Sequence, residues 1–238
     1  MRSTIRRIIW LALALLVASL VFARGLTDWM WFESLGYPSL LIAPWVWQLA
    51  VGAGGALLSF LILGASLLAA RPALARAYLR PELTQSLLAR PWARVQHWAT
   101  TLVAGLAVLL GFGVAGRWMD VAMFFYRQPF GVQDPVLNQD VSFYVYTLPL
   151  VRLVLSVLFA AVLVSVGLSG LIYTVAGILD WRRGGEGLRG RPRTHLFLLL
   201  SALALLWAAE SWLGRYDLLF SPRGVAFGAT YADVNVRL

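Results

Sequence analysis

Long uninterrupted apolar runs dominate the chain and predict membrane-spanning helices. About 20 apolar residues are enough to cross a bilayer as a helix. Five runs of this kind occur, none with a charge in its middle: residues 5–23, 46–70, 97–116, 148–179 and 194–213. The pattern therefore predicts an all-α polytopic integral membrane protein with about five spans, followed by an extracytoplasmic segment over residues 214–238.

The fourth run is longer than a single crossing needs. Its 32 residues, at about 1.5 Å per residue, exceed a roughly 30 Å hydrocarbon core. We expect this helix to tilt strongly, to kink near Gly167 and Gly170, or to begin as an interfacial helix.

The connections between the runs differ in composition. Two Arg-Pro steps predict two short helices, Ala73–Leu79 and Glu82–Ala89, on the cytoplasmic leaflet. Within the long connection 117–147, the segment Val141–Tyr146 fits equally a short strand or an interfacial segment. A loop of this length is often functional.

Composition and charge place and orient the chain. With 60% hydrophobic and only 13% charged residues, it is not a soluble globule. All 20 basic residues are arginine, the net charge is +9, and short cytoplasmic connections collect positive charge. An N-in, C-out arrangement puts 13 arginines inside and six outside, and tryptophans fall near both predicted faces. We therefore predict a multi-pass cell (inner) membrane protein that contacts anionic lipids at its cytoplasmic face and binds no nucleic acid.

Two alternative interpretations concern the ends of spans. Arg2, Arg6 and Arg7 before the first run also resemble a signal peptide, so that run is either a retained span or a cleaved leader. The string Gly111–Gly116 satisfies the G-x-G-x-x-G pattern of dinucleotide-binding folds, but it ends a span instead of following a strand. We interpret Ala107, Gly111 and Ala115, which recur every four residues, as a small-residue surface for close helix packing, like Gly52 and Ala56 on another span.

Few side chains are candidates for chemistry. Cysteine is absent, which removes disulfides and thiolate sites. Glu210 lies about one turn inside the end of the fifth run, where an unpaired carboxylate is expensive, and Arg152 at similar depth is its expected ion-pair partner; a relay or substrate role for Glu210 is the alternative. His97 and His195 open spans without metal-binding spacing and are interpreted as interfacial. We predict no catalytic residue, metal or cofactor.

Three separated motifs resemble uncharacterised protein family 0182, a family of large bacterial membrane proteins. They are Thr27–Tyr37, Phe130–Leu150, and Arg215–Leu219 with Gly228–Val234. The resemblance implies a multi-helix N-terminal membrane region followed by a large extracytoplasmic domain. It also implies that the rest of the membrane region and the whole outer domain are missing from this chain. The family has no established activity that carries over to any position.

The motifs supply the candidate functional residues of the outer loops, and the resemblance supplies the predicted role. The candidates are Asp28, Trp31, Asp134 and Asp140. We predict that the chain anchors and orients an extracytoplasmic domain; the alternative is a transporter or lipid-handling membrane protein. A membrane-protein partner or a second copy is a further possibility. Because residues 214–238 are rich in aromatic and apolar residues, they should lie on the loop 117–147 or be disordered.

Overall fold

The computed structural model describes residues 2–79, 92–179, 188–220, 228–231 and 235, and it divides the chain into two units, residues 1–49 and 50–238. The first unit contains α1 (Arg2–Ser34) and the beginning of α2 (Pro38–Tyr78). Gly36 separates these helices with a φ of 76°, a left-handed conformation that glycine adopts without strain, and Pro38 starts α2. The motif Thr27–Tyr37, predicted as a loop, is therefore helical up to Ser34.

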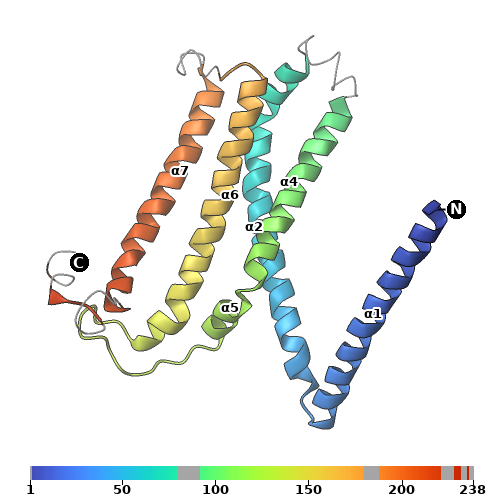
Figure 1. Cartoon of the computed structure of the whole chain (residues 1–238). Coiled ribbons are helices and arrows are strands. Elements are labelled where there is room, and N and C mark those ends of the chain that lie inside the picture. Colours follow the sequence, from blue (N-terminus) through green and yellow to red (C-terminus); the bar gives the residue numbers. More distant parts are fainter. Residues whose placement is uncertain (1, 80–91, 180–187, 221–227, 232–234, 236–238) are drawn as a thin grey trace. The chain divides into compact units, whose positions relative to one another are not determined.

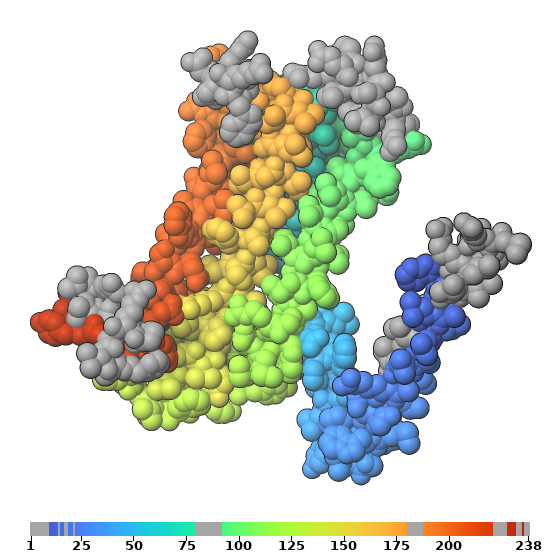
Figure 2. All heavy atoms as spheres, viewed as in Figure 1, coloured from blue at the N-terminus to red at the C-terminus, as the bar shows by residue number. Residues whose placement is uncertain are grey.

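The second unit is a bundle of helices (Figure 1). It contains α2 from Ala50 onward together with the following elements: α4 (Trp92–Ala115), α5 (Trp118–Phe125), the π-helical turn η1 (Phe143–Thr147), α6 (Leu148–Val175), α7 (Arg191–Leu213) and the 3-10 helix η3 (Gly214–Phe220). Helix α6 contacts α4, α5 and α7, and Figure 2 shows the side chains of α4 and α6 meeting in a continuous surface. We call the end of this bundle that carries α5, η1 and η3 the η3 end.

Four helical segments within the described residues are long and apolar enough to cross a membrane: Pro38–Tyr78, Trp92–Ala115, Phe143–Val175 and Arg191–Phe220. Each of them overlaps a different one of four of the five runs expected from the sequence. The run 5–23 lies in α1, which is not among these four. Over its described residues, the structure thus shows an all-helical chain with apolar helices that are compatible with a membrane.

Small residues at regular spacing build the core of the bundle. The buried positions of α2 alternate in steps of four and three: Ser59, Leu63, Ser66, Ala70, Ala73 and Ala77. On α6 a buried residue recurs every four positions from Leu153 to Tyr173. Gly111 of α4 lies so close to α2 that an added Cβ would meet the Gly52 carbonyl oxygen and the Ala56 Cβ. The interpretation of Gly111 as a helix-packing residue is therefore confirmed.

Three local predictions need correction or refinement. Helix α2 continues through Pro72 to Tyr78, so a separate helix at Ala73–Leu79 is wrong; the alanine face of this last part is buried against Tyr173 and its neighbours, which offsets the cost of the proline. The segment Glu82–Ala89 lies outside the described residues.

The other refinements concern the beginning of α6. The strand alternative for Val141–Tyr146 is wrong, because this segment is helical and leads through η1 into α6. Helix α6 is continuous through Gly167 and Gly170. The helix ends at Val175, so the last four residues of the run 148–179 lie outside it.

Candidate functional site

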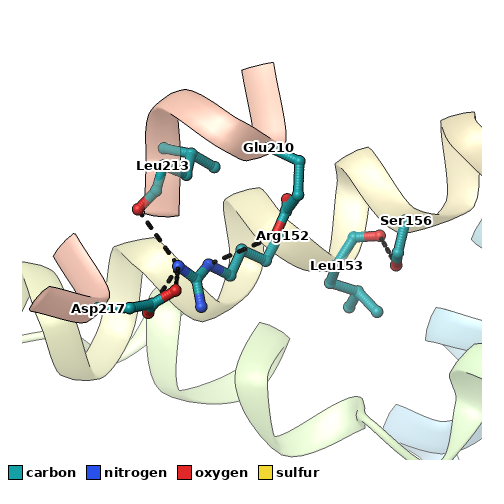
Figure 3. Close-up of polar contacts among 6 residues, drawn as sticks. All are labelled: Arg152, Leu153, Ser156, Glu210, Leu213 and Asp217. Atoms are coloured by element: carbon teal, nitrogen blue, oxygen red, sulfur yellow. Dashed lines mark hydrogen bonds and ion pairs between the residues drawn. The ribbon is translucent and has the colours of Figure 1, made fainter. Parts of the chain in front are cut away.

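An arginine cluster occupies the η3 end of the bundle, where α6, α7 and η3 meet. Arg152 lies near the start of α6, Glu210 in the last turn of α7 and Asp217 in η3. The Arg152 Nη2 lies 2.7 Å from both carboxylate oxygens of Asp217, whereas the Arg152 Nε lies 3.9 Å from Glu210 Oε1 (Figure 3). The structure thus brings the two expected residues together, but the closer partner of Arg152 is Asp217, which the sequence analysis did not identify.

Arg152 also binds the end of α7. Its Nη2 donates to the carbonyl oxygen of Leu213 at 3.3 Å (Figure 3). The last carbonyls of a helix have no donor within the helix, so a cation at this position satisfies one of them and interacts favourably with the helix dipole. One guanidinium group therefore joins the start of α6 to the end of α7 and to η3.

Aromatic packing fixes η3 in the same place. The Tyr216 side chain is buried, and its ring centroid lies 5.0 Å from that of Phe143 and 5.9 Å from that of Tyr144. Arg215 stacks on Trp212, with 3.6 Å between its Cζ and the ring centroid. The described start of the tail thus lies on aromatic residues of the connection 117–147, which is the first of the two alternatives expected for it.

A groove of about 540 Å³ opens beside Arg152. Its polar lining comes from Arg117, Arg152, Ser156 and Glu210, and its remaining lining is apolar. Arg117 is held by Asp120, 2.8 Å away. The groove therefore combines charged groups of both signs with apolar side chains.

The two acidic candidates of the loop 117–147 have structural contacts of their own. The Asp140 carboxylate accepts the backbone N–H groups of Phe130, Gly131 and Ser142. Hydrogen bonds from the Ser142 side chain and backbone, with smaller effects from Phe130 and Gly131, lower the pKa of Asp140 to about 2. Asp140 therefore stays ionised near neutral pH and orders the loop.

Asp134 also accepts hydrogen bonds within the same loop. Its Oδ2 accepts the backbone N–H of Leu137 at 2.6 Å and the Tyr144 hydroxyl at 3.2 Å. Its own backbone N–H donates to the carbonyl oxygen of Gln139. This arrangement closes a turn and connects it to η1.

Asp28 and Trp31 lie in the first unit, on α1, and both side chains are exposed. The Trp31 ring stacks edge-on against Phe32, with 4.8 Å between centroids. The structure thus divides the four outer-loop candidates between the two units.

A buried polar network inside the bundle was missed by the sequence analysis. The His195 Nδ1 lies 2.8 Å from the Tyr173 hydroxyl, and its Nε2 lies 3.3 Å from the Ser66 Oγ, which is 3.0 Å from the Ser169 Oγ. His195 is therefore directed into the bundle instead of toward lipid headgroups, which corrects its interfacial interpretation. The available signal was the four-residue spacing of Ser165, Ser169 and Tyr173.

His97, in contrast, is exposed and contacts Trp98, with 6.2 Å between ring centroids. Within the part of the chain that the structure describes, no group of three His, Cys, Asp or Glu side chains is arranged to hold a metal ion.

Comparison with known proteins identifies the family. Residues 5–238 match the Uncharacterised protein family (UPF0182). The chain belongs to this family. It is 34% identical to a UPF0182 protein of Thermobifida fusca over 95% of this chain and 23% of that protein. It is 34% identical to a UPF0182 protein of Cupriavidus necator over 94% of this chain and 25% of that protein. It is 32% identical to one of Moorella thermoacetica over 94% of this chain and 25% of that protein.

The chain therefore spans about a quarter of the length of the curated UPF0182 relatives it matches. No solved structure matches it.

Proposed function

We propose that this chain is the membrane-anchoring N-terminal region of a larger UPF0182 envelope protein and that it orients an extracytoplasmic domain. Four membrane-compatible helices supply the anchor. Relatives about four times as long supply the reason to expect a further domain. The proposal includes five spans in a multi-pass cell membrane protein with the N-terminus inside and the C-terminus outside.

One observation carries the orienting part of this proposal: η3 is held at the end of the bundle by two different kinds of contact. Arg152 binds Asp217 and the Leu213 carbonyl, and Tyr216 is buried against Phe143. A loose linker after α7 would leave the following chain free to swing. A fixed η3 sets the direction in which the chain continues.

The charge at the end of the bundle opposite the η3 end supports the proposed topology and the proposed contact with anionic lipids. This end carries six described arginines: Arg71, Arg76, Arg94, Arg189, Arg191 and Arg193. No acidic residue lies beside them within the described ranges of that end. Arginines near an anionic leaflet contribute about 1 kcal/mol each, so we propose that this end contacts anionic lipids at the cytoplasmic face.

Spin-label distances test the orienting role, because the chain has no cysteine and accepts labels at chosen sites. Labels at Leu163→Cys on α6 and Phe220→Cys in η3 should give a narrow distance distribution in the otherwise unchanged chain. Adding Asp217→Asn should broaden it, because the Asp217 carboxylate no longer attracts Arg152. Asp120→Asn, which removes a carboxylate bound to Arg117 and not to Arg152, is the matched control and should leave the distribution narrow. A broad distribution before Asp217 is changed would contradict a fixed η3.

The alternative function, a transporter or lipid-handling protein, has one observation in its favour. The groove beside Arg152 combines charged and apolar lining in a way that suits an amphipathic molecule. This observation concerns a binding site, and it is compatible with anchoring.

A further inference from the structure

The groove beside Arg152 has its polar and apolar parts in a definite order along α6 and α7. Arg152 lies near the first turn of α6 and Glu210 near the last turn of α7, so both belong to the η3 end. Arg117, which precedes α5, lines the groove at the same end. The charged lining is thus concentrated where α6 begins and α7 ends.

The apolar lining lies deeper along the same two helices. Phe159 is two turns further along α6, and Leu206 and Trp207 are about one turn back along α7. The Trp207 and Phe159 side chains are exposed on the bundle surface. A molecule that fills the groove would therefore meet charged groups at the η3 end and apolar side chains toward the middle of the helices, the order in which a phospholipid presents its headgroup and acyl chains.

The charges of the lining are of both signs, and two of them are incompletely bound. Two guanidinium groups and one carboxylate face the groove. The Arg152 Nε is buried and makes no hydrogen bond to any described residue, and its nearest carboxylate oxygen, on Glu210, is 3.9 Å away. This distance is too long for a hydrogen bond. The Glu210 carboxylate, on a side chain that is 50% exposed, is therefore available to a headgroup.

We infer that this groove binds a zwitterionic phospholipid with a primary ammonium headgroup. The arginine groups bind the phosphate, since guanidinium groups form strong charge-assisted hydrogen bonds with phosphate oxygens. Glu210 accepts hydrogen bonds from the ammonium group, which also explains an acidic side chain at this depth of a membrane helix. The acyl chains lie along Phe159, Leu206 and Trp207. This binding site is independent of the anchoring function proposed above.

Headgroup preference tests the inference. Three phospholipids with identical acyl chains and with ethanolamine, choline or glycerol headgroups are titrated into the 238-residue chain in a non-ionic detergent, and bound lipid is measured by native mass spectrometry. We expect the ethanolamine lipid to bind about tenfold more tightly than the other two, an effect comparable to one charged hydrogen bond. Choline lacks N–H donors for Glu210, and glycerol lacks the cation.

Variants assign the preference to Glu210. Glu210→Gln should lower the affinity for the ethanolamine lipid about tenfold, to that of the choline lipid. Glu33→Gln, which removes an exposed carboxylate from α1, is the matched control and should leave the preference unchanged. Arg117→Gln should weaken all three lipids while keeping their order, and it provides a second test if Glu210→Gln does not fold.

Equal affinities for the three lipids, tighter binding of the choline or glycerol lipid, or an unchanged preference in Glu210→Gln would overturn the inference. These outcomes leave the position of η3 untouched, because Asp217 and Tyr216 hold it through contacts that do not involve Glu210.

Discussion

At the residue scale, Arg152 and Tyr216 hold η3 by contacts of different strength. The Asp217 side chain is 57% exposed, and ion pairs this open contribute about 0.2–1 kcal/mol. Burying an aromatic or large apolar side chain such as Tyr216, which is 5% exposed, stabilises by about 1.5–3 kcal/mol. Tyr216 therefore supplies most of the stability, and Arg152 sets the position of η3 through its fixed hydrogen-bond directions.

The Asp140 carboxylate gives a prediction for the loop 117–147. Its pKa is lowered from 3.8 to about 2, so its contribution to loop stability is fully present above pH 3.8 and is lost as the pH falls through about 2. In Asp140→Ala, the backbone amides of Phe130, Gly131 and Ser142 lose their acceptor. Hydrogen exchange at these three amides should accelerate at neutral pH, and the difference from the unchanged chain should shrink as the pH falls through about 2.

Asp120→Ala is the control for that experiment, since Asp120 binds Arg117 and no backbone amide of that group. Unchanged exchange at the three amides in Asp140→Ala would show that the carboxylate does not order the loop.

Sequence reasoning reached part of the candidate site. Helix geometry places Arg152 and Glu210 at similar depth, and the structure brings them within 3.9 Å. Asp217 was not predicted as a partner, because a 3-10 turn after α7 brings it back to Arg152, and the pattern of residues 214–220 does not specify this turn. The bonds between His195 and Tyr173 depend in the same way on how α6 and α7 are rotated about their axes.

At the element scale, spacing predicts helices well because the apolar runs are long and the small residues recur at helical intervals. The buried face of α6 repeats every four residues, and Gly111 packs closely against a neighbouring helix as the spacing suggested; the structure identifies the neighbouring residues as Gly52 and Ala56. A helix start after Pro72 and the strand alternative for Val141–Tyr146 were wrong because local propensity favours them there, while tertiary packing decides otherwise.

The contact between α2 and α4 gives a second prediction. In Gly111→Ala, the new Cβ would approach the Gly52 carbonyl and come within 2.6 Å of the Ala56 Cβ and 2.8 Å of the Ala56 backbone nitrogen. The helices must separate, and overpacking of this kind destabilises by about 1–3 kcal/mol. Gly113→Ala, on the same helix with no heavy atom within 4 Å of the added Cβ, is the control. Thermal unfolding in detergent should show a lower midpoint for Gly111→Ala alone, and equal midpoints would disprove the close contact.

At the scale of the second unit, the two ends of the bundle differ in charge. The η3 end carries four described arginines together with five acidic residues: Asp120, Asp134, Asp140, Glu210 and Asp217. The opposite end carries described arginines without acids in its described ranges. Because positive charge is retained in short cytoplasmic connections, this asymmetry favours the η3 end on the outer side of the membrane.

Reporter fusions test the resulting topology along the chain. Fusions after Arg90 and after Arg189 should report the cytoplasm, because each follows an arginine-rich stretch, and fusions after Gln133 and after Leu238 should report the outside. Replacing Arg189, Arg191 and Arg193 together by glutamine should weaken the cytoplasmic signal of the Arg189 fusion. Replacing Arg117 and Arg127 by glutamine should strengthen the outside signal of the Gln133 fusion, which lies in the same connection. An outside signal after Arg189 in the unchanged chain would reverse the orientation of α6 and α7. It would place the groove and η3 on the cytoplasmic side and remove the basis for an extracytoplasmic domain after η3.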